Sequence, residues 1–97
     1  MRVIARKVLR DFWGKHPDAE QPLKEWFAVA ANATWRNPAQ IKAVYRNASF
    51  LANNRVVFNI KGNDYRLIAA VKYTHGIVYI RFIGTHAAYN RIDAVTV

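Results

Sequence analysis

A histidine and a tyrosine stand three positions apart near the end of this chain, at His86 and Tyr89. Both side chains can transfer protons, and they follow a run of strand-forming residues, IVYIRFIG, that ends at a glycine. Such a pair suits phosphodiester cleavage by an RNA 2′-hydroxyl, in which one group takes the hydroxyl proton and another protonates the leaving oxygen. A structural role is the alternative, with His86 capping the strand end and Tyr89 packing over the sheet edge.

This chemistry also needs cations to stabilise the extra negative charge on the phosphorane. The chain has 15 Lys and Arg against 6 Asp and Glu, a net charge of +9, and no acidic residue between Glu25 and Asp64. A field of this sign attracts nucleic acid or an acidic protein. The alternative is a basic surface that only keeps the protein in solution.

Other kinds of site have little support in the sequence. Cysteine is absent, which excludes disulfides and thiolate metal sites and fits a reducing cytoplasm. The histidines, at 16, 75 and 86, form no metal-ligand pattern with carboxylates, so we expect no metal and no cofactor. The only serine, Ser49, is expected in a loop without a histidine nearby, and KGND predicts a hairpin turn, not a phosphate loop.

The first half of the chain predicts helices. A short strand at residues 2–5 is followed by apolar residues at helical spacing up to Phe12, and His16 and Pro17 end that helix. Asp18 is a candidate N-cap for a second helix whose stripe runs to Ala30. Asn37 and Pro38 begin a shorter helix, and Trp35 before it is the tryptophan expected to be exposed.

The second half predicts three strands, RVVFNI, DYRLIAAVKY and GIVYIRFIG, joined by short turns and therefore antiparallel. We expect an α+β fold in which two N-terminal helices pack on one face of a twisted, mainly antiparallel sheet of about four strands. Alternation along each strand places Arg66 and Lys72 on the other face of the sheet from Leu67, and Arg81 on the other face from Ile80 and Phe82. The cations are then expected on the uncovered face.

The length of 97 residues predicts a single domain, 1–97, with one compact core. No apolar run of 18 residues occurs, and charges interrupt the hydrophobic residues of the N-terminus. We therefore expect a soluble cytoplasmic protein with no membrane association.

The order of motifs resembles a known family. VVFNIKGNDYRLIAAVKY followed by IVYIRFIGTHAAYN, together with NPAQIKAVY and the two helices, is similar to the HigB group of toxins. These are RelE-like messenger-RNA interferases of type II toxin-antitoxin systems. The resemblance implies metal-independent cleavage of messenger RNA in the ribosomal A site and neutralisation by a HigA-like helix-turn-helix antitoxin.

Carried over by position, the resemblance implies catalytic roles for Arg66, His86 and Tyr89, with Arg66 stabilising the phosphate. It implies RNA binding by the residues of the turn and the sheet, Lys61, Asn63, Lys72 and Arg81. Which residue is the base and which the acid stays open.

Two positions depart from the family pattern. Lys61 stands where a glycine is usual before the turn glycine, and Asn90 stands where an acid usually follows the tyrosine. Weakened activity is therefore one expectation. Two alternatives to a nuclease remain, namely a basic module that only binds RNA or an acidic partner, and a degenerate toxin that keeps only its antitoxin contact.

Overall fold

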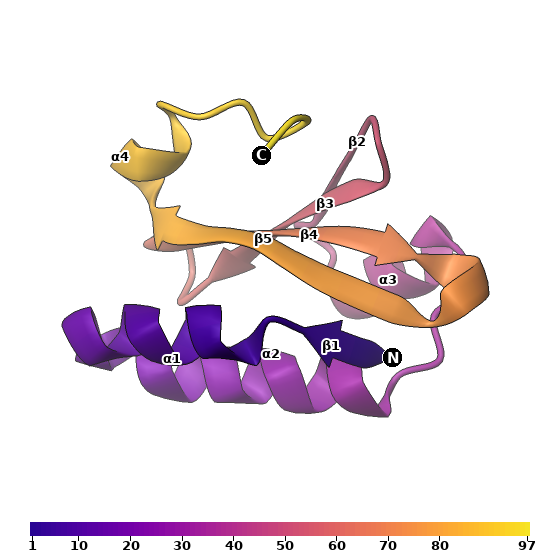
Figure 1. Ribbon diagram of the computed structural model, residues 1–97, viewed down its shortest axis with the longest axis horizontal. Helices are drawn as coiled ribbons and strands as arrows, with labels where there is room; N and C mark the ends of the chain where they lie inside the picture. The colour runs from indigo at the N-terminus through magenta and orange to yellow at the C-terminus, as the bar shows by residue number, and fades with distance from the viewer.

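The computed structural model describes residues 1–97 and has an α+β architecture (Figure 1). The elements are β1 (Arg2–Ile4), α1 (Arg6–Lys15), η1 (Pro17–Ala19), α2 (Glu20–Asn32), α3 (Pro38–Val44), β2 (Ser49–Leu51), β3 (Arg55–Ile60), β4 (Tyr65–Lys72), η2 (Tyr73–His75), β5 (Ile77–Thr85) and α4 (His86–Tyr89). The sheet order is β1-β5-β4-β3-β2, and only the β1–β5 pair is parallel. Helices α1 and α2 lie together on one face (Figure 1). The predicted fold class is confirmed, with five strands where about four were expected.

The helix pair follows the predicted pattern except where α2 begins. Its buried side chains are Leu9 in α1 and Leu23, Trp26 and Ala30 in α2. Pro17 starts the short 3-10 helix η1, so α2 begins only at Glu20. Asp18 is therefore not the N-cap of α2, and this prediction was wrong. No helix in the chain combines the length and apolar character needed to cross a lipid bilayer.

The middle of the chain holds one confirmed prediction and two wrong ones. Asn37 caps α3, because its side chain accepts a hydrogen bond from the backbone N–H of Gln40 at 3.1 Å. Trp35 is only 5% exposed and packs edge-on against Tyr45, at 6.3 Å between ring centroids. Ser49 begins β2, the unpredicted fifth strand, since three residues are too few to show an alternation.

Strand β4 separates the two faces of the sheet as predicted. Its core side chains beneath the helices are Tyr65, Leu67, Ala69 and Val71. Ile68 shares the opposite face with Arg66, yet it is fully buried. This face was expected to be uncovered, but α4 and residues 91–97 lie over it (Figure 1). The cationic residues therefore border a partly covered surface.

A β-bulge in β5 changes which side chains reach the core. Where β4 passes from Ile68 to Ala69, β5 has one extra residue, Arg81. The sequence predicts Phe82 on the helix-covered face, and this was wrong. Because the bulge reverses the alternation, Ile83 packs against the core. Phe82 pairs with Ile68 and shares its face of the sheet, away from the helices.

Candidate active site

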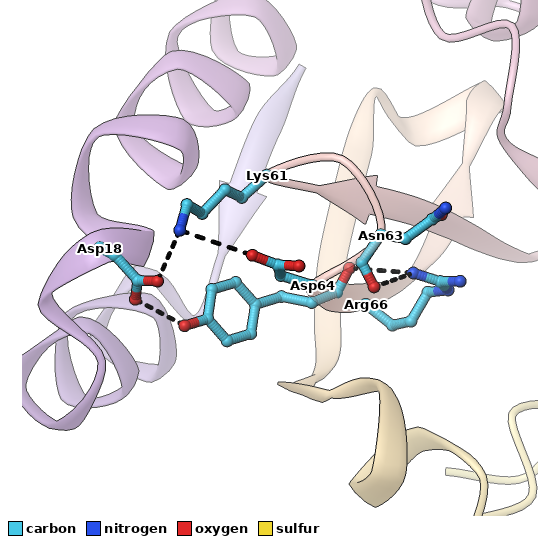
Figure 2. Close-up of polar contacts among 6 residues, drawn as sticks. Asp18, Lys61, Asn63, Asp64 and Arg66 are labelled. Carbon is cyan, nitrogen blue, oxygen red and sulfur yellow. Dashed lines mark hydrogen bonds and ion pairs between the residues drawn. The ribbon is translucent and has the colours of Figure 1, made fainter.

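The turn between β3 and β4 places Arg66 at the start of β4, the central strand of the sheet. Lys61 and Gly62 have left-handed backbone conformations, with φ of +53° and +63°, which reverse the chain tightly. Arg66 is half-buried, and its Nη1 donates to the backbone carbonyl of Asn63 at 3.1 Å (Figure 2). Its Nε and Nη2 groups have no partner in the protein and can bind an anion.

The short helix α4 brings His86 and Tyr89 to Arg66. Thr85 starts this helix, because its hydroxyl accepts a hydrogen bond from the N–H of Ala88 at 3.1 Å. His86 and Tyr89 are one turn apart and their ring centroids lie 6.4 Å from each other. The guanidinium carbon of Arg66 lies 5.9 Å from the centroid of the Tyr89 ring. We call Arg66, His86 and Tyr89 the α4 cluster.

Asn90 contacts the ring of His86. The Asn90 side-chain nitrogen lies 3.1 Å from Nδ1 of His86. An amide N–H can only donate, so this contact is a hydrogen bond when Nδ1 carries no proton. The His86 side chain is exposed, which leaves its Nε2 open to a substrate. The amide holds the ring where the family pattern has a carboxylate.

Lys61 lies on the other side of the turn from Arg66 (Figure 2). Its Nζ lies 2.8 Å from Asp18 and 3.5 Å from Asp64, and Asp18 also accepts a hydrogen bond from the Tyr65 hydroxyl at 2.5 Å. Hydrogen bonds from Lys61 and Tyr65 lower the pKa of Asp18 below its usual value, and the bonds to Asp18 raise the pKa of Lys61. The structure therefore does not bring Lys61 together with the α4 cluster. Instead, the Lys61–Asp18 ion pair links η1, between the two helices, to the turn that carries Asn63.

Replacing Asp18 with asparagine is expected to lower the free energy of unfolding at pH 7. Because the pKa of Asp18 is lowered in the folded protein, its stabilisation is complete above the unfolded pKa of about 3.9 and is lost as the pH falls through the folded value. Urea unfolding at several pH values measures this: the gap between wild type and Asp18→Asn should close as the pH falls below about 4. Asp11→Asn, which removes only an exposed pair with Lys7, is the control and should change little. A gap that does not depend on pH would contradict this account.

Lys72 lies toward the other end of the sheet face, and Arg81 lies between it and Arg66, at the bulge opposite Ile68 and Ala69. Arg66 and Lys72 are six positions apart along β4, a distance of ~20 Å. Lys72 and Arg81 line a hollow of about 300 Å³ together with Arg55 and Tyr79. The structure brings these cations together, but apart from the α4 cluster.

The C-terminal segment is held against this hollow. Nε of Arg81 and Nη2 of Arg55 both donate to the carbonyl oxygen of Val97, at 3.1 and 2.8 Å. Asn53 also donates to the carbonyl of Val95, at 3.3 Å. The segment therefore folds back over the sheet.

Two residues beside the site were missed by the sequence reasoning. Arg55 pairs with Ala70, and Asn59 pairs with Arg66, so both belong to the cationic face. The Asn59 amide also donates to the Asn63 side chain at 3.4 Å. The alternation in RVVFNI, which puts residues 55 and 59 on one side, would have identified them.

The fold and the site together define a class: a small basic α+β protein in which an arginine from the central strand lies close to a histidine and a tyrosine of a short helix. Residues 19–92 match the family model described as the RelE-like toxic component of a toxin-antitoxin system, HigB_toxin. The chain belongs to the HigB toxin family. Membership implies an antitoxin partner.

Relatives of this chain carry matching names. The mRNA interferase toxin HigB of Escherichia coli (strain K12) is 32% identical over 98 residues, which cover 98% of this chain and 93% of that protein. The mRNA interferase HigB of Shigella flexneri has the same identity and coverage. The mRNA interferase HigB of Escherichia coli O6:H1 is 21% identical over 94 residues, covering 95% of this chain and 91% of that protein. The resemblance seen in the sequence motifs is confirmed.

Proposed function

We propose that this chain is a ribosome-dependent endoribonuclease that stops translation by cutting messenger RNA in the ribosomal A site. The observation that carries the proposal is the α4 cluster, in which the centroid of the Tyr89 ring lies 5.9 Å from the guanidinium carbon of Arg66 and 6.4 Å from the centroid of the His86 ring. The full-length similarity to proteins named mRNA interferase supports it. A HigA-like helix-turn-helix antitoxin holds the activity in check in the cytoplasm.

The proposed reaction uses the RNA as its own nucleophile. The 2′-hydroxyl oxygen bonds to the adjacent phosphorus as its proton passes to Tyr89, the bond from phosphorus to the 5′-oxygen breaks, and the leaving oxygen takes up a proton from His86. Arg66 binds the phosphate oxygens as charge develops, and His86, as the imidazolium, donates from Nε2 to the leaving oxygen. Tyr89, whose ring is close to both Arg66 and His86, accepts the hydroxyl proton as its phenolate. These side chains supply the acid and the charge, so the proposed cleavage needs no metal ion.

The remaining cations guide the RNA. Lys72 and Arg81, with Arg55, lie along the same face as Arg66, and together they can follow a phosphate backbone across the sheet. The Asn63 turn supports Arg66 at the end of this path. Lys61 acts indirectly in this account, through Asp18 and the position of the turn.

The cellular test is to induce the chain and map new messenger-RNA ends by primer extension. We expect growth arrest, with cuts inside translated reading frames, and relief of both when the antitoxin is co-expressed. A basic module that only binds would slow growth without new ends, and its effect would not depend on His86 and Tyr89. Intact messages during arrest would reject the nuclease.

Asn90→Asp is expected to move the pH profile of cleavage toward higher pH. A carboxylate at this position would accept a proton from Nδ1 and favour the charged imidazolium, whereas the native amide donates to Nδ1. The measurement is the single-turnover cleavage rate from pH 5.5 to 9. Asn90→Ala is the control, because it removes the hydrogen bond without adding charge. An unchanged profile in Asn90→Asp would show that His86 does not set the rate, and a gain from almost no activity would identify a degenerate toxin.

A further inference from the structure

A groove with an apolar floor lies between α2 and the end of α3. It has a volume of about 320 Å³ and is lined by Trp26, Val29, Val44 and Tyr45, with Glu25 and Lys61 at its edges. Val29 and Val44 are 40% and 56% exposed, and they are two of the four large apolar side chains that reach the surface. Apolar groups gathered in a hollow on a highly charged protein indicate a binding surface.

A second hollow continues the groove and adds a positive charge. It has a volume of about 290 Å³, shares Val44 and Tyr45 with the first, and reaches Arg46. Arg46 is exposed and forms no ion pair or side-chain hydrogen bond within the chain. The combined surface therefore offers an apolar bed followed by a free guanidinium.

One residue that lines the groove carries an unpaired polar group. Trp26 is only 2% exposed, and its indole Nε1 is buried without a hydrogen-bond partner. A buried donor left unpaired is costly and uncommon in native proteins. Tyr45 beside it stays a neutral donor, since burial raises its pKa to about 12. A ligand that brings a carbonyl oxygen over an apolar side chain would satisfy this site.

We propose that this groove binds a segment of the antitoxin in which an apolar side chain is followed by a carboxylate. The apolar side chain would cover Val29 and Val44, a backbone carbonyl would accept from Trp26, and the carboxylate would pair with Arg46. An acidic segment fits a partner of a chain with net charge +9. This inference rests on the antitoxin partner of the proposed function and not on the cleavage reaction.

An RNA ligand fits the groove poorly. The surface of the groove between α2 and α3 is mostly apolar, and Glu25 at its edge would repel a phosphate backbone. Lys61, the cation at its edge, is already paired with Asp18. None of the groove residues belongs to the α4 cluster, and α3 and α4 lie toward opposite ends of the long axis in Figure 1. Antitoxin binding and RNA cleavage can therefore be measured as separate properties.

The test is the affinity of the full-length chain for its purified antitoxin, measured by calorimetry. In the Val29→Gln/Val44→Gln variant, loss of apolar contact should weaken binding about tenfold or more. Trp26→Phe, which removes only the N–H and part of the ring, should weaken it by about three- to tenfold. Val8→Gln, at a valine on α1 that is 37% exposed, close to the 40% of Val29, should bind as wild type does.

Cleavage by all three variants should remain at the wild-type rate. Wild-type antitoxin affinity in the Val29→Gln/Val44→Gln variant would overturn the proposal. So would a loss of cleavage with unchanged antitoxin affinity, which would assign the groove to RNA. If wild-type protein fails to cut messenger RNA but the groove variants still lose antitoxin, the groove stands and the proposed nuclease falls.

Discussion

Replacing His86 with alanine is expected to reduce messenger-RNA cleavage by ~10²–10⁴-fold, the usual contribution of a positioned acid or base. The imidazole is exposed, and its contacts are the Asn90 amide and the edge of Tyr89, so little packing is lost. Single-turnover cleavage on translating ribosomes and urea unfolding of the same preparation separate the two effects. The fold should remain stable to within ~0.5 kcal/mol, as for a surface substitution.

The chain provides a matched control for this change. His75 is also exposed, and its Nδ1 also has a polar neighbour, the Thr74 hydroxyl at 3.1 Å, but it lies in η2, outside the α4 cluster. His75→Ala should cut as wild type does. Equal activity in His86→Ala and His75→Ala would remove His86 from the mechanism and favour its structural role at the strand end.

Replacing Arg66 with glutamine is expected to cost ~10²–10³-fold in cleavage, because the transition state loses a fixed cation. Arg66→Lys keeps the charge but loses the planar pair of donors, so its cleavage rate should fall between those of wild type and Arg66→Gln. The hydrogen bonds to Asn63 and Tyr65 carbonyls are also lost, at a cost to folding of about 1 kcal/mol. The measurement is again single-turnover cleavage, with unfolding as the parallel readout.

Arg10→Gln is the control for net charge. Arg10 is exposed on α1, which covers the opposite face of the sheet, so this variant loses the same charge outside the site. Cleavage by Arg10→Gln should stay near wild type. If both arginine variants slow the reaction equally, the effect belongs to the overall field of the protein and not to Arg66 at the phosphate.

Patterns within one element predicted the fold well. The helix pair, the Asn37 cap and the division of β4 into a core face and a cationic face follow from spacing along a few residues. The grouping of Arg66 with His86 and Tyr89 also follows from neighbouring antiparallel strands, since Arg66 pairs with Gly84 just before α4. Local periodicity and short turns carry this information.

Other differences from the prediction arose where distant segments meet. The bulge at Arg81, which moves Phe82 away from the core, depends on the pairing of β5 with β4 and has no sign in the alternation of β5 alone. Lys61 is adjacent to the site in sequence, but Asp18, 43 positions earlier, draws its side chain toward the helices. The fold of residues 91–97 over the sheet depends on Arg55 and Arg81 in the same way.

Asn90 shows how a departure from a family pattern can be reconsidered once the structure is known. In the sequence, the missing carboxylate indicated weakened activity. In the structure, the amide still contacts the His86 ring, at 3.1 Å from Nδ1. Asn90 can therefore orient the ring as a carboxylate would, and the pH profile of Asn90→Asp tests what the difference in charge does.

The most direct test adds the purified protein to one messenger RNA, either naked or on translating ribosomes. The reaction runs without EDTA, and EDTA is added only to stop it before the RNA ends are mapped. We expect cuts at the A-site codon only when ribosomes are translating, leaving a 2′,3′-cyclic phosphate and a 5′-hydroxyl, and we expect His86→Ala to form these ends at least ~10²-fold more slowly. Message left intact on translating ribosomes, or the same ends formed by His86→Ala at the wild-type rate, would contradict this mechanism.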